Sequence, residues 1–182
     1  IIMNRILYTI LLLIINLFVL AQTNTSSPYS RFGLGELQEN IFSEFNAIGG
    51  GVTAFSSANN INPYNPASYT DFSSNSFLFS TGLNHKTLNL QNTIDEQITN
   101  NTSFSHFVIG FPISRKIGAS MGILPYSNMG YNIESRDDIY NTNLSYLGDG
   151  GVSKIYFGGA YELSRKLSIG LNASYLFGAL NK

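Results

Sequence analysis

The chain has 182 residues, a formal net charge of −1 and no cysteine, and only 12% of its residues are charged. A near-neutral chain lacks the basic stripe of a nucleic-acid-binding protein, and a chain without cysteine has neither a disulfide framework nor a thiolate metal site. Soluble domains carry about 25% charged residues. Here glycine, serine, asparagine and aromatic residues take that share, which predicts an all-β protein.

The first predicted element is a secretory signal peptide over residues 1–21. Arg5 supplies a positive charge, residues 6–20 form an almost unbroken apolar run, and Ala21 offers a small residue at a cleavage site. The alternative is a membrane-anchoring helix, but a run of about 15 residues is short for a span of about 20. The pattern therefore predicts export through the inner membrane, with cleavage after Ala21.

Residues 22–74 are predicted to form a compact plug, also called a hatch. Glycine and proline interrupt regular structure throughout this range, with a short helix expected over residues 37–46. Asn65, Pro66 and Ala67 suit the start of a second helix, with Asn65 as its cap. Gly49, Gly50 and Gly51 permit a tight turn, which is predicted to act as a hinge of the plug. A phosphate-binding loop is not expected there, because no Lys-Ser/Thr pair follows.

Residues 75–182 alternate with a period of two, which indicates β-strands. In the clearest example, residues 166–178, one face carries Leu167, Ile169, Leu171, Ala173, Tyr175 and Phe177, and the other carries mainly serine, glycine and asparagine. A membrane-spanning barrel strand of about 9–11 residues has this pattern. The alternative is a half-buried strand of a soluble sandwich. Weaker examples cover residues 77–83, 103–113, 117–123 and 152–163.

Two copies of a Ser-Arg-Lys sequence separate these runs, at residues 114–116 and 164–166. We expect both to be short periplasmic turns, and residues 89–102 and 127–151 to be long extracellular loops, with a strand extension over 131–140. About five strands result, whereas a bacterial barrel closes with at least eight. We therefore expect the remaining strands to lie beyond residue 182. The alternative is a small barrel completed by oligomerisation.

No arrangement in the sequence predicts an enzyme. Ser105 and His106 are neighbours, so in a regular strand they point to opposite faces and cannot act together as nucleophile and base. Glu134, Asp137, Asp138 and Asp149 do not match the spacing of an EF-hand loop. We expect no catalytic residue, no metal and no cofactor.

The segments Ser-Pro-Tyr-Ser-Arg-Phe-Gly-Leu-Gly-Glu (27–36), Ala-Ile-Gly-Gly (47–50) and Asn-Pro-Tyr-Asn-Pro-Ala-Ser-Tyr (62–69) resemble the hatch of FadL/TodX-type outer-membrane transporters. The resemblance implies a monomeric barrel in the outer membrane, in contact with lipid. It implies uptake of fatty-acid-like hydrophobic compounds, gated by a plug that Asn65, Pro66 and Ala67 shape. Family members that serve as scaffolds or shuttles in protein secretion keep a non-transporting alternative open.

Overall fold

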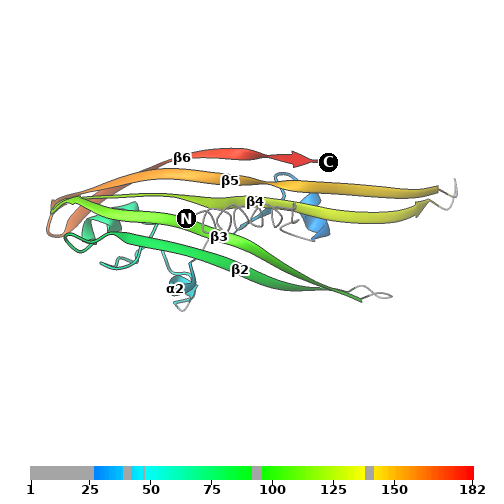
Figure 1. Ribbon diagram of the computed structural model, residues 1–182, viewed down its shortest axis with the longest axis horizontal. Helices are drawn as coiled ribbons and strands as arrows, with labels where there is room; N and C mark the ends of the chain where they lie inside the picture. Colours follow the sequence, from blue (N-terminus) through cyan, green and yellow to red (C-terminus); the bar gives the residue numbers. More distant parts are fainter. Residues whose placement is uncertain (1–26, 39–41, 47, 92–95, 138–141) are drawn as a thin grey trace, which may run out of the picture.

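The computed structural model describes residues 27–38, 42–46, 48–91, 96–137 and 142–182, and the predicted signal peptide (1–21) lies outside them. Five long strands form an antiparallel sheet in chain order (Figure 1): β2 (Leu78–Gln91), β3 (Glu96–Ser114), β4 (Ile117–Asp137), β5 (Thr142–Ser164) and β6 (Leu167–Asn181). A short strand, β1 (Glu36–Leu37), pairs with β4. The all-β prediction is confirmed. Within the described residues the sheet is open, with β2 and β6 at its two edges.

Both Ser-Arg-Lys sequences form tight turns, as predicted. Ser114 pairs with Ile117 and Ser164 pairs with Leu167, which leaves only an Arg-Lys dipeptide at each tip. The serine hydroxyl accepts a hydrogen bond from the lysine backbone N–H in each turn, at 3.3 and 3.4 Å. The serine thus compensates for backbone bonds that the reversing chain cannot make.

The long polar loops predicted at residues 89–102 and 127–151 are wrong. Strands β4 and β5 stay paired out to Asp137 and Thr142, and β2 and β3 out to Gln91 and Glu96. Strand pairing is made by hydrogen bonds between backbone N–H and C=O groups. Polar side chains therefore do not end a strand whose two faces are both exposed to water. Cross-strand polar pairs such as Thr87 Oγ1 donating to Asn100 Oδ1 (2.8 Å) stabilise the pairing further. The strand extension predicted over 131–140 is confirmed up to Asp137, and residues 138–140 lie outside the described residues.

The β2–β3 hairpin and the β4–β5 hairpin pair with each other over only part of their length. Strands β3 and β4 pair only over Phe107–Ser114 and Ile117–Ile123. Beyond that point β3 continues with β2 alone, while β4 continues with β5 and, over two residues, with β1 (Figure 1). We call the stretch over which β3 and β4 do not pair with each other, residues 96–106 of β3 and 124–137 of β4, the seam.

The described residues between 27 and 76 form what we call the amino-terminal segment. Its β1 pairs at the edge of β4, and its helix η2 (Pro66–Asp71) packs on β3 to β6, on the face of the sheet that we call the covered face. The helices of the segment are short, with η1 (Pro28–Arg31) and α2 (Ser43–Asn46) preceding η2. Of the helix predicted over 37–46, the described residues show one turn, α2, and residues 39–41 lie outside them. Helix η2 starts at Pro66 as predicted, but Asn65 makes no side-chain cap. Its amide donates to Phe55 O (3.4 Å) instead.

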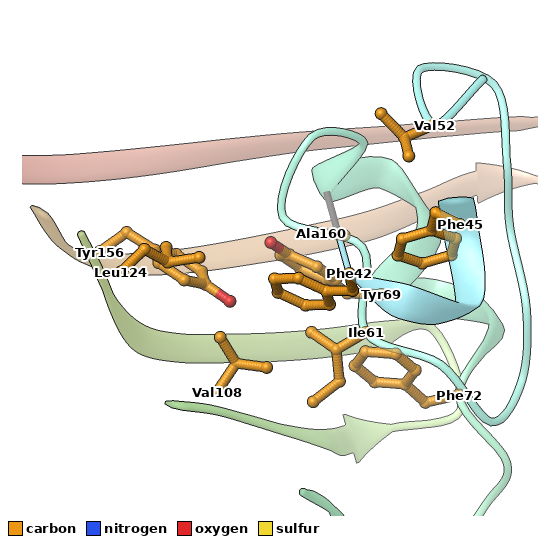
Figure 2. Packing of buried hydrophobic residues seen from close by; sticks show 10 residues of the cluster. All are labelled: Phe42, Phe45, Val52, Ile61, Tyr69, Phe72, Val108, Leu124, Tyr156 and Ala160. Carbon is orange, nitrogen blue, oxygen red and sulfur yellow. The ribbon is translucent and has the colours of Figure 1, made fainter. Parts of the chain in front are cut away.

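The core lies between this segment and the covered face (Figure 2). The segment contributes mainly aromatic side chains: Phe42, Phe45, Tyr69 and Phe72, with Val52 and Ile61. The sheet contributes Val108, Leu124, Tyr156 and Ala160. Among the described residues, no helix is both long and apolar enough to cross a membrane.

The opposite side, the bare face, carries the apolar members of the period-two pattern. Leu171 is 83% exposed and Phe157 58% exposed. On β6, the alternate residues Ser168, Gly170 and Asn172 face the amino-terminal segment and are half-buried. The predicted alternation is confirmed, with the small and polar residues against the segment and the large apolar residues uncovered.

Candidate functional site

The closest contact between the segment and the sheet is made by η2 against glycines. A Cβ atom at Gly170 would overlap the Pro66 carbonyl carbon and the Ala67 nitrogen, and one at Gly118 would overlap the Tyr69 carbonyl. Any other residue at these two positions would push η2 away from the sheet. The glycines on this face therefore determine how closely η2 approaches.

Asn172 of β6 anchors the same region through hydrogen bonds. Its Nδ2 donates to Pro63 O (2.7 Å), and its Oδ1 accepts from the Tyr69 hydroxyl (3.1 Å). The Thr70 hydroxyl adds a bond to Ser168 Oγ (3.1 Å). One asparagine side chain thus ties both the chain entering η2 and the helix itself to β6.

A second asparagine, Asn62, orders the loop that leads into η2. It is buried, and its Nδ2 donates to Val52 O (2.6 Å) and Phe55 O (2.9 Å) while its Oδ1 accepts from Tyr64 N (3.1 Å). Neither Asn62 nor Asn172 stands out in the sequence as a site residue. The only signal for Asn62 was its place before Pro63, and Asn172 looked like one of several polar residues on a strand.

Of the residues predicted to shape a plug, Asn65, Pro66 and Ala67 lie together at the entry to η2, with Pro66 and Ala67 against Gly170. Gly49 and Gly50 have φ angles of +69° and +75°, whereas Gly51 is not in the left-handed region. Gly49 and the partly buried Gly50 form a turn after α2, and the exposed Gly51 follows it. Their role as a hinge stays a prediction.

The expectation that Ser105 and His106 point to opposite faces is wrong. Gly82 pairs with His106 and Leu83 with Phe104, so Ser105 is the extra residue of a β-bulge. The bulge buries both side chains, with Ser105 Oγ 3.0 Å from His106 Nδ1. Ser80 Oγ lies 2.9 Å from His106 Nε2.

The His106 ring stacks on Phe42 with 3.7 Å between ring centroids. Both ring nitrogens bond serine hydroxyls, so the imidazole joins the amino-terminal segment to β2 and β3 as part of the packing. The other histidine, His85, lies on the exposed part of β2, with Nδ1 2.9 Å from Thr102 Oγ1. In the described ranges, no group of three or more His, Cys, Asp or Glu side chains is placed to hold a metal ion.

The bare face contains a shallow apolar groove of about 710 Å³ across β3 to β6. Its floor includes the small residues Gly122 and Ala173, and larger side chains surround them: Phe107, Ile109, Met121, Ile123, Ile155, Phe157 and Tyr175. Polar surface is nearly absent. This groove offers contact to hydrocarbon, without groups that would orient a polar ligand.

A family model described as BamG matches residues 3–182 of the chain. No curated protein and no solved structure gives a match. The resemblance to FadL/TodX transporters is therefore wrong, because the pattern that fits almost the entire chain belongs to a different family. Short glycine- and proline-rich motifs occur wherever a segment must pack closely on a sheet. They therefore indicate close packing and are a weak guide to the family.

Proposed function

Because the chain belongs to the BamG family, which is related to the Bam complex, we propose that it takes part in the assembly of outer-membrane proteins. The family match over residues 3–182 carries this proposal. It agrees loosely with the non-transporting scaffold that the sequence left open. Uptake of hydrophobic solutes was implied only by the FadL/TodX resemblance. Because that resemblance is wrong, we do not propose a transport function.

The family also indicates an association with the outer membrane. We propose that the sheet is part of the wall of a transmembrane β-barrel, with the bare face toward lipid. The exposed Leu171 and Phe157, the apolar groove and the near absence of charge around them support this orientation. The amino-terminal segment would then lie in the interior as a plug, held by η2 and Asn172.

Assembly is tested by depleting the protein in its own organism and measuring the amounts of folded outer-membrane proteins. We expect several of them to fall together, with their unfolded forms accumulating in the periplasm. Restoring the wild-type gene should reverse the loss. Normal levels of folded outer-membrane proteins after complete depletion would contradict the proposal.

The membrane orientation is tested with tryptophan reporters, because the chain contains no tryptophan. Leu171→Trp places one on the bare face, and Asn143→Trp places one at the exposed start of β5, remote from the apolar groove. In vesicles of brominated lipid, we expect strong quenching of the first reporter and little quenching of the second. Equal quenching of the two would contradict a lipid-facing bare face.

A further inference from the structure

The edge of β4 that faces the seam already accepts strand-like partners. Strand β1 pairs there, with Glu36 opposite Asn128 and Leu37 opposite Ser127. Gln38 continues the contact by donating its backbone N–H to Tyr126 O (2.9 Å). The amino-terminal segment thus occupies this edge over a few residues only.

Ser30 extends the contact by one step, with a side chain in place of a strand. Its Oγ accepts from Gly130 N (3.1 Å), and its single proton is shared between Ser27 O (2.6 Å) and Gly130 O (3.2 Å). The backbone groups of Gly130 therefore point into the seam. Because alternate residues of a strand present their N–H and C=O to the same side, Asn132 and Glu134 also present theirs there. Within the described parts of the chain, no strand pairs with this side of β4 beyond Asn128.

The part of the segment held at this edge carries uncovered apolar side chains. The large ones are Tyr29 (78% exposed), Phe32 (65%), Leu34 (52%) and Leu37 (59%). They belong to a part of the segment that contacts β4 between Tyr126 and Gly130, whereas the apolar groove includes β4 only over residues 121–123. A cluster of exposed apolar side chains in such a place is typical of an interaction surface.

We propose that the seam binds an extended polypeptide with alternating apolar side chains, which adds as a strand to the edge of β4 next to β1. Backbone hydrogen bonds from Asn132 and Glu134 would provide affinity, and the apolar residues around Phe32 would favour a partner with the period-two pattern. The partner is thus defined by its chemistry, a polypeptide with a free backbone edge and one apolar face, independently of the proposed function.

The test uses the full-length protein in detergent and three fluorescent peptides with the same alternating Val/Thr sequence. One peptide is unmodified, and the other two carry N-methyl groups on the amides of one edge or of the opposite edge. Strand addition uses a single edge of the peptide, so we expect one methylated peptide to bind like the unmodified one. The other should bind about tenfold more weakly or worse, through the loss of several hydrogen bonds. Equal affinity of all three peptides would overturn the proposal, because it would indicate non-specific apolar binding without backbone hydrogen bonds.

A matched pair of variants tests the protein side. Asn132→Pro removes the N–H that faces the seam, whereas Asn132→Ala keeps it, and proline is tolerated at an edge whose N–H is free. We expect weaker peptide binding only in the proline variant, with circular dichroism confirming that both fold. Identical binding, or a seam occupied by a second copy of the chain, would overturn the proposal. Peptide binding and the depletion phenotype are separate readouts, so either can fail without the other.

Discussion

Replacing Gly118 by alanine is expected to loosen η2 without detaching it. The new Cβ would overlap the Tyr69 carbonyl, which is backbone and cannot rotate away, so η2 must shift. Overpacking of this kind costs about 1–3 kcal/mol. Leaving the sheet would expose the fully buried Tyr69, at about 1.5–3 kcal/mol. It would also break three hydrogen bonds at about 0.5–1.5 kcal/mol each. Detachment therefore costs more than the strain it relieves.

Hydrogen exchange of residues 61–76 in the full-length protein measures this loosening. A strain of 1–3 kcal/mol in the docked state should speed local exchange by roughly 5- to 150-fold. Gly159→Ala is the matched control, because its Cβ lies on the bare face with Gly118 O, at 3.9 Å, as its nearest neighbour. Both substitutions restrict the unfolded chain equally. Equal exchange rates in the two variants would refute the argument that glycine sets the approach of η2.

The double variant Gly118→Ala, Gly170→Ala sharpens the result. Both glycines contact the same helix, so a displacement caused by one relieves strain at the other. The combined effect on exchange should therefore be smaller than the product of the two single effects. Simple multiplication would mean that the two glycines act on independent contacts.

The remaining predictions concern the same site and the bare face. Asn172→Ala should increase protease cleavage within residues 61–76, because Pro63 and Tyr69 lose their partner, whereas Asn143→Ala on exposed β5 should not. Burial raises the pKa of the Tyr69 phenol above its usual value near 10. The phenol is therefore protonated more readily when η2 is docked than when it is detached. The resulting stabilisation of the docked state is complete at pH values below the usual pKa, and it is lost as pH rises through the raised pKa. Tyr69→Phe should remove this part of the alkaline loosening, measured by protease cleavage across a pH series, and an identical pH profile in both proteins would contradict it. Leu171→Arg should lower the free energy of unfolding in bilayers by about 2–4 kcal/mol if the residue lies near the bilayer midplane. Lys116→Arg, in the turn, should leave it unchanged. Urea unfolding in vesicles measures both variants.

The sequence by itself determined the apolar parts of the strands, the two Ser-Arg-Lys turns and the two faces of the sheet. Period-two alternation over residues 166–178 and the repeated Ser-Arg-Lys turns are local properties, and the structure has them where they were predicted. Local patterns did not predict where the strands end, because backbone hydrogen bonds set those ends. Polar residues near Asn89 and Tyr131 did not end their strands, because a ladder needs no apolar side chains.

Only the tertiary structure decided how the amino-terminal segment meets the sheet. Gly118 and Asn172 acquire their roles from contacts with residues far away in the chain, and no spacing in the sequence relates them to Tyr69. The bulge at Ser105 reversed an expectation that assumed a regular strand, because one inserted residue changes which face a side chain occupies. The seam likewise depends on where β3 and β4 stop pairing, which is set by the packing of two hairpins and not by either strand alone.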